Sequence, residues 1–208
     1  MATTLDLGRS NTVPTRLKAF GAVWPMRTGE AWDGAAPIAT TQIPANIDTE
    51  LQWFDDRSGA KANVAWVSDY VAQPFTLAGT VTFAIRASES ATTVNIGLRG
   101  KLIRLPWDQT EDMAVVASAN RSGEIATSST DYTWTATPTS TLFKVNDRLM
   151  FQGFWYPTST TGAGTAAIND AGSANKYVQI TEDVTFSTSP ILIPIRSVPV
   201  LGQPRPLF

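Results

Sequence analysis

Paired acidic residues are the side chains in this sequence that could do catalytic chemistry. They stand at Asp55-Asp56, Glu111-Asp112 and Glu182-Asp183, and glycoside hydrolysis needs two carboxylates across one cleft. Adjacent residues of a strand point to opposite faces, so no single pair forms such a dyad. The sequence has no histidine and no cysteine, which removes imidazole bases, thiol nucleophiles and the usual zinc ligands. A protein that is not an enzyme is therefore expected.

Two oxygen-rich stretches could offer ligands to calcium. They are residues 108–112 (DQTED) and Asn169-Asp170 together with Asn175. Calcium takes six to eight oxygen ligands, and neither stretch has the spaced acidic pattern of a calcium loop. No metal and no cofactor is expected.

Several aromatic side chains could stack on sugar rings. They are Trp107, Trp134, Trp155 and Tyr156. Core tryptophans and interface anchors have the same appearance in a sequence. Carbohydrate recognition is therefore kept as an alternative function.

The composition is that of a weakly charged globular protein. The chain has 208 residues, 16% of them charged, and a net charge of −2, with seven Trp and nine Phe to build a core. Lys and Arg are scattered singly, so no nucleic-acid partner is expected. No apolar run approaches the length of a membrane span, and no signal-peptide pattern opens the sequence, so no membrane partner is expected. The lack of cysteine fits assembly in a reducing cytoplasm.

The middle of the chain has the period of β-strands that would position these groups. Thr80–Arg86 alternates strictly, with Val81, Phe83 and Ile85 on one face, as in a half-buried strand. The alternation changes phase at Gly100, which indicates either a β-bulge or two separate strands. Further strands are expected at 51–54, 63–71, 92–105, 113–118, 132–136, 142–144, 148–156, 176–180 and 183–187, and residues 159–173 are expected to form a long loop. The expected fold is all-β, a two-sheet β-sandwich of the jelly-roll type, with an up-and-down barrel as the alternative.

Extended arms are expected at both ends of this body. Residues 1–48 form a proline-interrupted N-terminal arm with one strand near Leu17–Trp24, residues 49–188 form the body, and residues 189–208 form a proline-rich tail. Proline holds a chain extended, and the apolar residues between the prolines favour docking into a groove. An edge strand of the chain's own sandwich is the alternative for the tail. The candidate partner-binding residues are Trp24, Trp32, Ile191, Ile193, Ile195, Val198, Val200, Leu201, Leu207 and Phe208.

Two segments resemble structural proteins of tailed bacteriophages. They are Trp66–Leu105 and Asn146–Pro157. The shared features are a strand ending in Val67-Ser68, a Leu-Ala-Gly step into the strand of Leu77–Arg86, the turn at Glu89-Ser90, the strand of Asn95–Leu105, and the strand start at Asp147–Leu149. Proteins of this kind are jelly-roll sandwiches of the virion, including capsid cement and decoration proteins.

This resemblance gives the arms an expected role. The chain is expected to be a virion cement or decoration protein, assembled in the host cytoplasm, that stabilises a capsid by bridging subunits. Its expected partners are the major capsid protein or other virion subunits, and copies of itself in a trimer or dimer. A carbohydrate-recognition module of a phage tail or fibre is the alternative.

Overall fold

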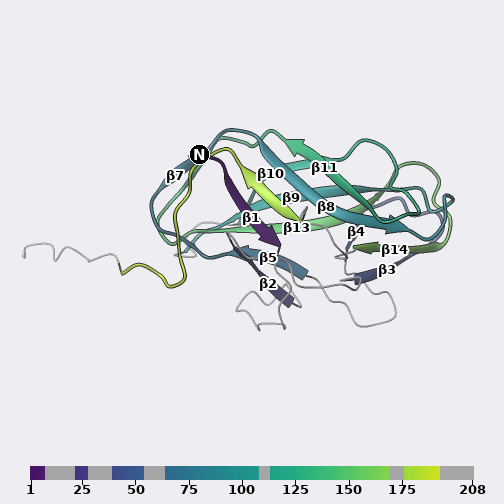
Figure 1. Ribbon diagram of the computed structural model, residues 1–208, viewed down its shortest axis with the longest axis horizontal. Helices are drawn as coiled ribbons and strands as arrows, with labels where there is room; N and C mark the ends of the chain where they lie inside the picture. The colour runs from purple at the N-terminus through teal and green to yellow at the C-terminus, as the bar shows by residue number, and fades with distance from the viewer. Residues whose placement is uncertain (8–21, 28–38, 54–63, 108–112, 169–175, 193–208) are drawn as a thin grey trace, which may run out of the picture.

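The computed structural model describes residues 1–7, 22–27, 39–53, 64–107, 113–168 and 176–192 (Figure 1). Within these ranges the chain forms sixteen β-strands and no helix, which confirms the expected all-β class. It follows that no described helix is long and apolar enough to span a membrane.

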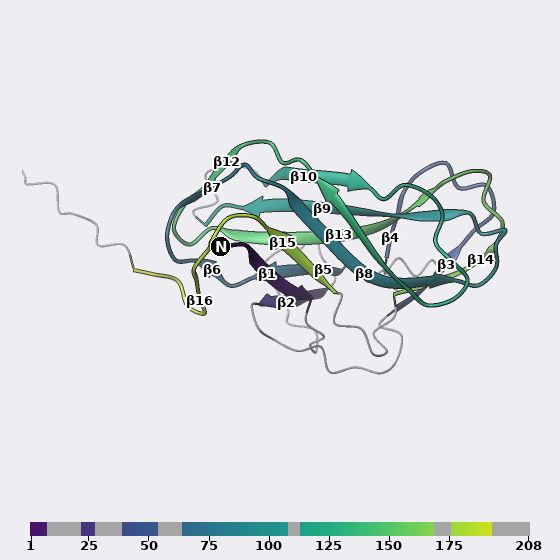
Figure 2. The same ribbon diagram turned by 45° about the horizontal axis from the view of Figure 1, so that its top comes forward.

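One hydrogen-bonded sheet of 12 strands folds over on itself into two layers (Figures 1 and 2). The first layer contains β10 (Ala114–Asn120), β9 (Ile96–Leu105), β13 (Arg148–Pro157), β5 (Val64–Ser68) and β4 (Leu51–Gln52). The second contains β11 (Thr130–Ala136), β8 (Val81–Glu89), β15 (Tyr177–Ile180), β14 (Gly164–Ile168) and β3 (Ala39–Ile43). The path between the layers runs through β2 (Ala22–Arg27) and β1 (Thr3–Leu7). The expected two-sheet sandwich is thereby confirmed.

Neighbouring strands are mostly not consecutive in the sequence. In the order β10-β9-β13-β5, the neighbours β9 and β13, and β13 and β5, are separated in sequence by other elements, which excludes the up-and-down barrel. The long strand β13 pairs with β9 along its length and with β5 and then β4 on its other side. In the second layer β8 has β11 on one side and β15, then β14, on the other.

Aromatic side chains fill the space between the layers. Val81, Phe83 and Ile85 of β8 are buried, as their alternation predicts. The ring of Phe83 lies 5.5 Å from that of Phe151 on β13, in the other layer. Trp53 packs against Phe151 and Trp155, with ring centroids 5.6 and 5.8 Å away. These contacts form one core that joins the two layers.

The strand around Gly100 is continuous, so the predicted bulge or break at this residue is wrong. β9 pairs with β13 without interruption from Ile96 to Leu105, and Gly100 leaves room for the Phe83 ring, which would lie 2.9 Å from an added Cβ. The alternation of apolar residues in the sequence changes phase here because β9 is apolar on both faces. Ile103 and Leu105 face away from the main core into a second buried cluster with Ala65, Val67 and Met150.

The N-terminal segment contributes strands to the sandwich. β1 pairs with β15 and β2, β2 runs parallel to β5, and β3 pairs with β14. Leu5, Leu7 and Ile43 are buried in the main core. Three strands of residues 1–48 therefore lie within the sheet, and the strand expected near Leu17–Trp24 lies at Ala22–Arg27.

The expected loop at 159–173 contains a strand. Its residues Gly164–Ile168 form β14, which is hydrogen-bonded to both β3 and β8. Small residues suit this position because an added Cβ at Gly164 would lie 2.5 Å from Val94.

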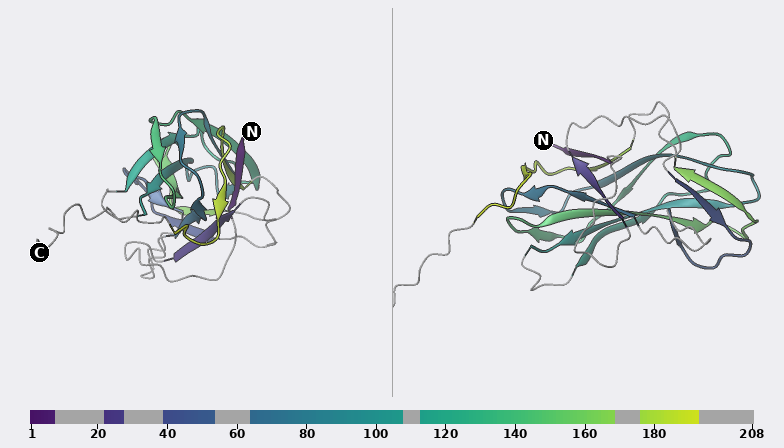
Figure 3. Two further views of the ribbon diagram at one scale, coloured as in Figure 1. Left: turned by 90° about the vertical axis from the view of Figure 1, so that its left-hand side faces the viewer. Right: turned by 90° about the horizontal axis from the view of Figure 1, so that it is seen from below.

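Two short pairs close one end of the sandwich. β6 (Tyr70–Val71) pairs with β16 (Phe186–Ser187), and β7 (Phe75–Leu77) pairs with β12 (Thr141–Phe143). The N-terminus lies at the same end (Figure 2). The left view of Figure 3 looks onto it.

Candidate functional site

The described residues include seven exposed large hydrophobic side chains, which are Met1, Trp107, Met113, Val115, Leu142, Ile191 and Leu192. Leu142 lies in β12 and Trp107 packs against Tyr70 of β6. The N-terminus and the strands β6, β7, β12 and β16 lie at one end of the sandwich (Figure 2), and we call this end the apolar end. Single exposed apolar residues are ordinary, but a group of them marks an interaction surface. At the opposite end the exposed side chains include Ser90, Thr92, Thr93, Ser159 and Thr160.

A buried aspartate organises the apolar end. Asp147, 2% exposed, accepts hydrogen bonds from Arg104 Nε at 2.6 Å and from the backbone amides of Lys144 at 2.8 Å and Trp107 at 3.1 Å. The carboxylate thereby joins the end of β9 to the turn between β12 and β13. A buried ion pair with further hydrogen bonds fixes geometry more than it adds stability.

Trp107 is the largest exposed side chain that this framework holds in place. Its indole is 48% exposed and packs edge-on against Tyr70, with ring centroids 5.5 Å apart and an interplanar angle of 85°. The Arg148 guanidinium lies 4.8 Å from the Tyr70 ring centroid, and Arg148 Nε donates to Ser68 O at 2.6 Å. Trp, Tyr and Arg are the residue types most enriched at binding hot spots.

The start of the C-terminal tail is anchored beside this group. Asn146 Nδ2 donates to Ile191 O at 2.8 Å, and Ile191 N donates to Asn146 Oδ1 at 2.7 Å. Asn146 has φ of 71°, a conformation that asparagine adopts more readily than most residues. The next residue, Leu192, is 92% exposed. The last described residue of the chain is thus exposed at the apolar end.

The N-terminus is fixed at the same end. Thr3 Oγ1 donates to Glu182 O and accepts from Val184 N, both at 2.8 Å. Glu182 Oε1 accepts from the amides of Ala78 and Gly79 at 2.9 and 2.7 Å. Burial raises the pKa of Glu182, but these hydrogen bonds outweigh it and leave that pKa below its ordinary value. The Glu182 carboxylate therefore has a structural role.

The structure places only some of the predicted partner-binding residues. Ile191 lies at the apolar end, in the anchored start of the tail. Trp24 lies in β2, where only the backbone is described. The remaining residues lie outside the described ranges: Trp32, Ile193, Ile195, Val198, Val200, Leu201, Leu207 and Phe208. Tyr70, Asn146 and Arg148 were missed, because only the fold brings them together.

Two of the aromatic residues considered for sugar binding belong to the core. Trp155 is fully buried and donates through Nε1 to Thr41 Oγ1 at 2.9 Å. Trp134 is 7% exposed and donates to Ala119 O at 3.1 Å. Neither indole can stack on a sugar without leaving the core, and Tyr156 is tied to Arg121 O through its hydroxyl. Trp107 keeps an exposed ring.

The remaining acidic and calcium candidates lie outside the residues that the structure describes. Asp55-Asp56, Glu111-Asp112 and the calcium candidates at 108–112, 169–170 and 175 lie outside the described ranges. In the part of the chain that the structure describes, no group of three His, Cys, Asp or Glu side chains could hold a metal.

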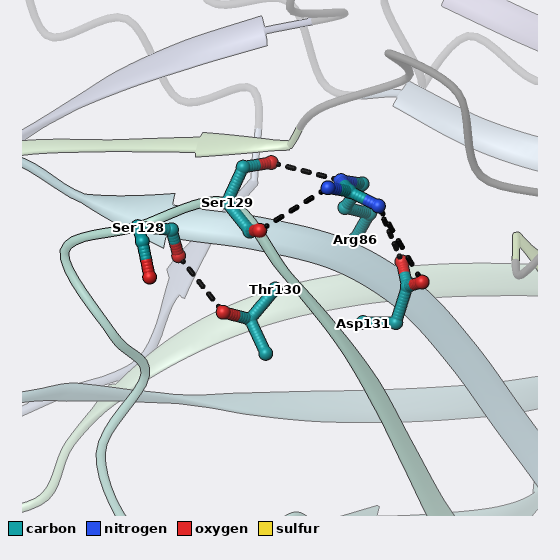
Figure 4. A network of polar contacts seen from close by, with 5 residues as sticks. All are labelled: Arg86, Ser128, Ser129, Thr130 and Asp131. Atoms are coloured by element: carbon teal, nitrogen blue, oxygen red, sulfur yellow. Dashed lines mark hydrogen bonds and ion pairs between the residues drawn. The ribbon is translucent and has the colours of Figure 1, made fainter.

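A polar network on the second layer ties β8 to β11 (Figure 4). Arg86 Nε donates to Ser129 Oγ at 3.0 Å, Nη2 to Ser129 O at 3.3 Å, and Nη1 lies 3.5 Å from Asp131 Oδ1. Arg86 and Asp131 face each other across the strand pair. Their charges offset one another, so this network holds the layer together.

Comparison with known proteins identifies the fold. No protein-family model matches the sequence, and no curated protein matches it. An α-amino acid ester hydrolase has a TM-score of 0.57 at 12% identity, over 88% of this chain and 36% of its own. A CocE/NonD family hydrolase from Staphylococcus aureus has a TM-score of 0.50 at 10% identity, over 89% of this chain and 37% of its own. The chain thus spans little more than a third of the length of these two proteins.

These comparisons overturn the expectation that the chain is not an enzyme. That expectation rested on the absence of histidine and cysteine and on acidic pairs without a shared cleft. The two solved structures above are hydrolases, so a β-sandwich of this kind does not exclude an enzymatic setting. At identities of 12% and 10% the likeness shows the fold alone.

Proposed function

We propose that the chain is a virion structural protein of the cement or decoration type, which binds neighbouring subunits through its apolar end and through residues 189–208. The observation that carries this proposal is the gathering of exposed hydrophobic residues where the anchored tail begins. The resemblance of residues 66–105 and 146–157 to tailed-phage structural proteins supplies the kind of assembly.

Physical chemistry supports a protein partner for this surface. Trp107, Tyr70 and Arg148 offer a rigid anchor of the type that dominates binding energy. Specific interfaces bury about 1,200–2,000 Å² in total, and the sixteen residues from 193 to 208 add further apolar side chains and four prolines to the sequence available for contact. Many equivalent sites on a particle would strengthen the attachment through avidity.

The experiment measures how much protein each particle carries. Particles are assembled with the wild-type chain, with Trp107→Ala, or with residues 193–208 deleted, and occupancy is quantified by mass spectrometry. Both variants are expected to lower occupancy at least tenfold. Wild-type occupancy for both variants, with both correctly folded, would contradict the proposal.

The Asn146 anchor allows a sharper test. Asn146→Gly keeps a residue that tolerates positive φ but removes both side-chain hydrogen bonds to Ile191. Asn46→Gly is the matched control, because Asn46 has φ of 56° and lies at the opposite end. Occupancy is expected to fall for Asn146→Gly alone.

A second candidate is a β-sandwich module that works beside a hydrolase catalytic domain. It is favoured because the structural match to the ester hydrolase covers 88% of this chain but only 36% of the ester hydrolase. Hydrolysis of α-amino acid esters by the purified chain, or by a complex that it forms, would support this candidate. Trp107→Ala should leave such hydrolysis unchanged if the apolar end serves assembly instead.

A further inference from the structure

Two aromatic rings at the apolar end stand nearly at right angles to each other. The indole of Trp107 and the ring of Tyr70 have centroids 5.5 Å apart and an interplanar angle of 85°, and we call these two rings the aromatic corner. Trp107 is 48% exposed and Tyr70 is half-buried. A ligand can therefore reach the corner from solvent.

The aromatic corner is held in place before any partner arrives. Trp107 N donates to the buried Asp147 carboxylate at 3.1 Å. The Arg148 guanidinium lies 4.8 Å from the Tyr70 ring centroid, and its Nε is tied to Ser68 O at 2.6 Å. A site whose side chains are already ordered loses little entropy when it binds.

Each ring of the corner carries a polar hydrogen that the described part of the chain does not use. No described residue accepts a hydrogen bond from Trp107 Nε1 or from the Tyr70 hydroxyl. Aromatic faces with such donors are the groups that bind proline-rich chains in the polyproline II conformation, which is ordered before it binds. The chemistry of the corner thus favours a proline-rich ligand.

The chain itself contains a sequence of this kind. Residues 193–208 include Pro194, Pro199, Pro204 and Pro206, with Ile, Val and Leu between them. The share of proline in this segment far exceeds the average for proteins, about 5%.

These sixteen residues follow a point that lies close to the corner. Asn146 exchanges two hydrogen bonds with Ile191, and its neighbour Asp147 binds the amide of Trp107. A polyproline II chain rises about 3.1 Å per residue, so in that conformation Pro199 would stand about 22 Å beyond Leu192. The prolines from 199 onward would therefore pass the corner of their own chain and reach that of a neighbour.

We propose that residues 198–206 of one copy bind the aromatic corner of a second copy. Binding is reciprocal, so two identical contacts close a dimer. This inference rests on the proposed function for the binding role of residues 189–208, and it adds the partner and the mode of recognition. The prolines pack on the two rings, and backbone carbonyls between them accept from Trp107 Nε1 and the Tyr70 hydroxyl.

The test is sedimentation equilibrium of the purified full chain over a wide range of concentration. A dimer is expected, and an excess of a synthetic peptide of residues 193–208 should return it to monomer. Trp107→Ala should raise the dissociation constant of the dimer at least tenfold, as loss of a hot-spot tryptophan does. The double variant Pro199→Ala, Pro204→Ala should weaken the dimer as well.

Two control variants separate this contact from general stickiness. Leu142 is 52% exposed in β12 at the same end, and Leu142→Ala should leave the dissociation constant unchanged. Ser197→Ala changes the tail outside the proposed segment and should also leave it unchanged. Trp107→Ala keeps the hydrogen bond to Asp147, because the backbone amide makes it, and circular dichroism checks that the variant folds.

Three results would overturn the proposal. The first is a chain that stays monomeric at every concentration, including one whose tail binds its own corner. The second is a dimer that Trp107→Ala retains in full, and the third is a dimer that excess peptide does not dissociate. None of these measurements uses particles, so a chain that dimerises in this way but never attaches to a particle would contradict the proposed function alone.

Discussion

Glu89 and Glu182 have opposite pKa shifts, and therefore opposite effects of pH on stability. Burial and Glu124 raise the pKa of Glu89 from 4.5 to about 8. Below pH 4.5 Glu89 is protonated in both the folded and the unfolded state, and its contribution to stability is complete. As pH rises, Glu89 ionises in the unfolded state before it does in the folded state, so the contribution falls until pH passes about 8. The free energy of unfolding of Glu89→Gln, relative to that of the wild type, should therefore increase from pH 5 to pH 8. Urea titrations measure this difference.

Glu182→Gln provides the control of opposite sign. The hydrogen bonds from Ala78 and Gly79 keep the pKa of Glu182 low, so its contribution is present above pH 4.5 and lost as pH falls through the folded pKa. Relative to wild type, this variant should be less stable at pH 6 and lose that deficit in acid. If the stabilities of both variants, relative to wild type, changed with pH in the same direction, the opposite pKa shifts of Glu89 and Glu182 would be wrong.

Asp147 is the residue whose loss should damage the apolar end most. Asp147→Ala leaves the Arg104 guanidinium, 11% exposed, without its carboxylate, and breaking a buried pair costs about 3–5 kcal/mol. The matched control is Asp131→Ala, whose pair with Arg86 is more exposed and is worth about 0–1 kcal/mol. Chemical denaturation of both variants measures the difference, and equal losses would contradict the organising role of Asp147.

Among the elements, β9 and β13 meet at two glycines that make space for aromatic rings. Gly100 pairs with Gly153, and an added Cβ at Gly153 would lie 2.0 Å from Trp53 Cε3. Overpacking of this kind costs about 1–3 kcal/mol and sometimes more. Gly153→Ala should therefore lower stability, measured by urea denaturation, while Gln152→Ala on the other face should change it little.

A double variant distinguishes the steric cause from a propensity effect. Trp53→Leu removes the ring that the new Cβ would contact, so adding Gly153→Ala to it should cost less than in the wild-type background. If the two costs simply add, the Trp53 contact is not the reason for the glycine.

Strands with strict alternation could be predicted from the sequence because one face of each is buried. β8 and β11 are of this kind, as Val81, Phe83, Tyr132 and Trp134 show. β9 could not be predicted correctly, because its outer face packs into the second cluster and both of its faces are apolar. β14 was missed because Gly164, Thr165 and Ala166 have the composition of a loop, and its partners β3 and β8 define it.

The candidate site could be predicted only in part. The apolar tail was readable from its prolines, and Ile191 is the one predicted tail residue that the structure describes. The Trp107 anchor was not readable, because Tyr70 of β6 packs against Trp107 and Arg148 of β13 packs against Tyr70. Asn146 resembled an ordinary turn residue, since its hydrogen bonds to Ile191 span 45 positions.

At the scale of the whole molecule, the two ends of the described chain have different mechanical roles. β1 pairs with β15 near the C-terminus of the described chain and with β2, and so completes the path between the layers. The last described residues, Ile191 and Leu192, are exposed, and Ile191 is joined to the body by its hydrogen bonds with Asn146. Damage at the first site should affect folding, and damage at the second should affect binding.

Removal of residues 2–7 is therefore expected to destabilise the whole sandwich. It deletes the buried side chains of Leu5 and Leu7, and each Leu→Ala change in a core alone costs about 2–5 kcal/mol. It also removes the backbone partners of β15, whose amides should lose protection in hydrogen exchange. Leu192→Ala is the control, because a surface substitution changes stability by about 0.5 kcal/mol or less. A truncated chain that unfolds at the wild-type temperature would mean that β1 is dispensable and that the layers are joined by the core alone.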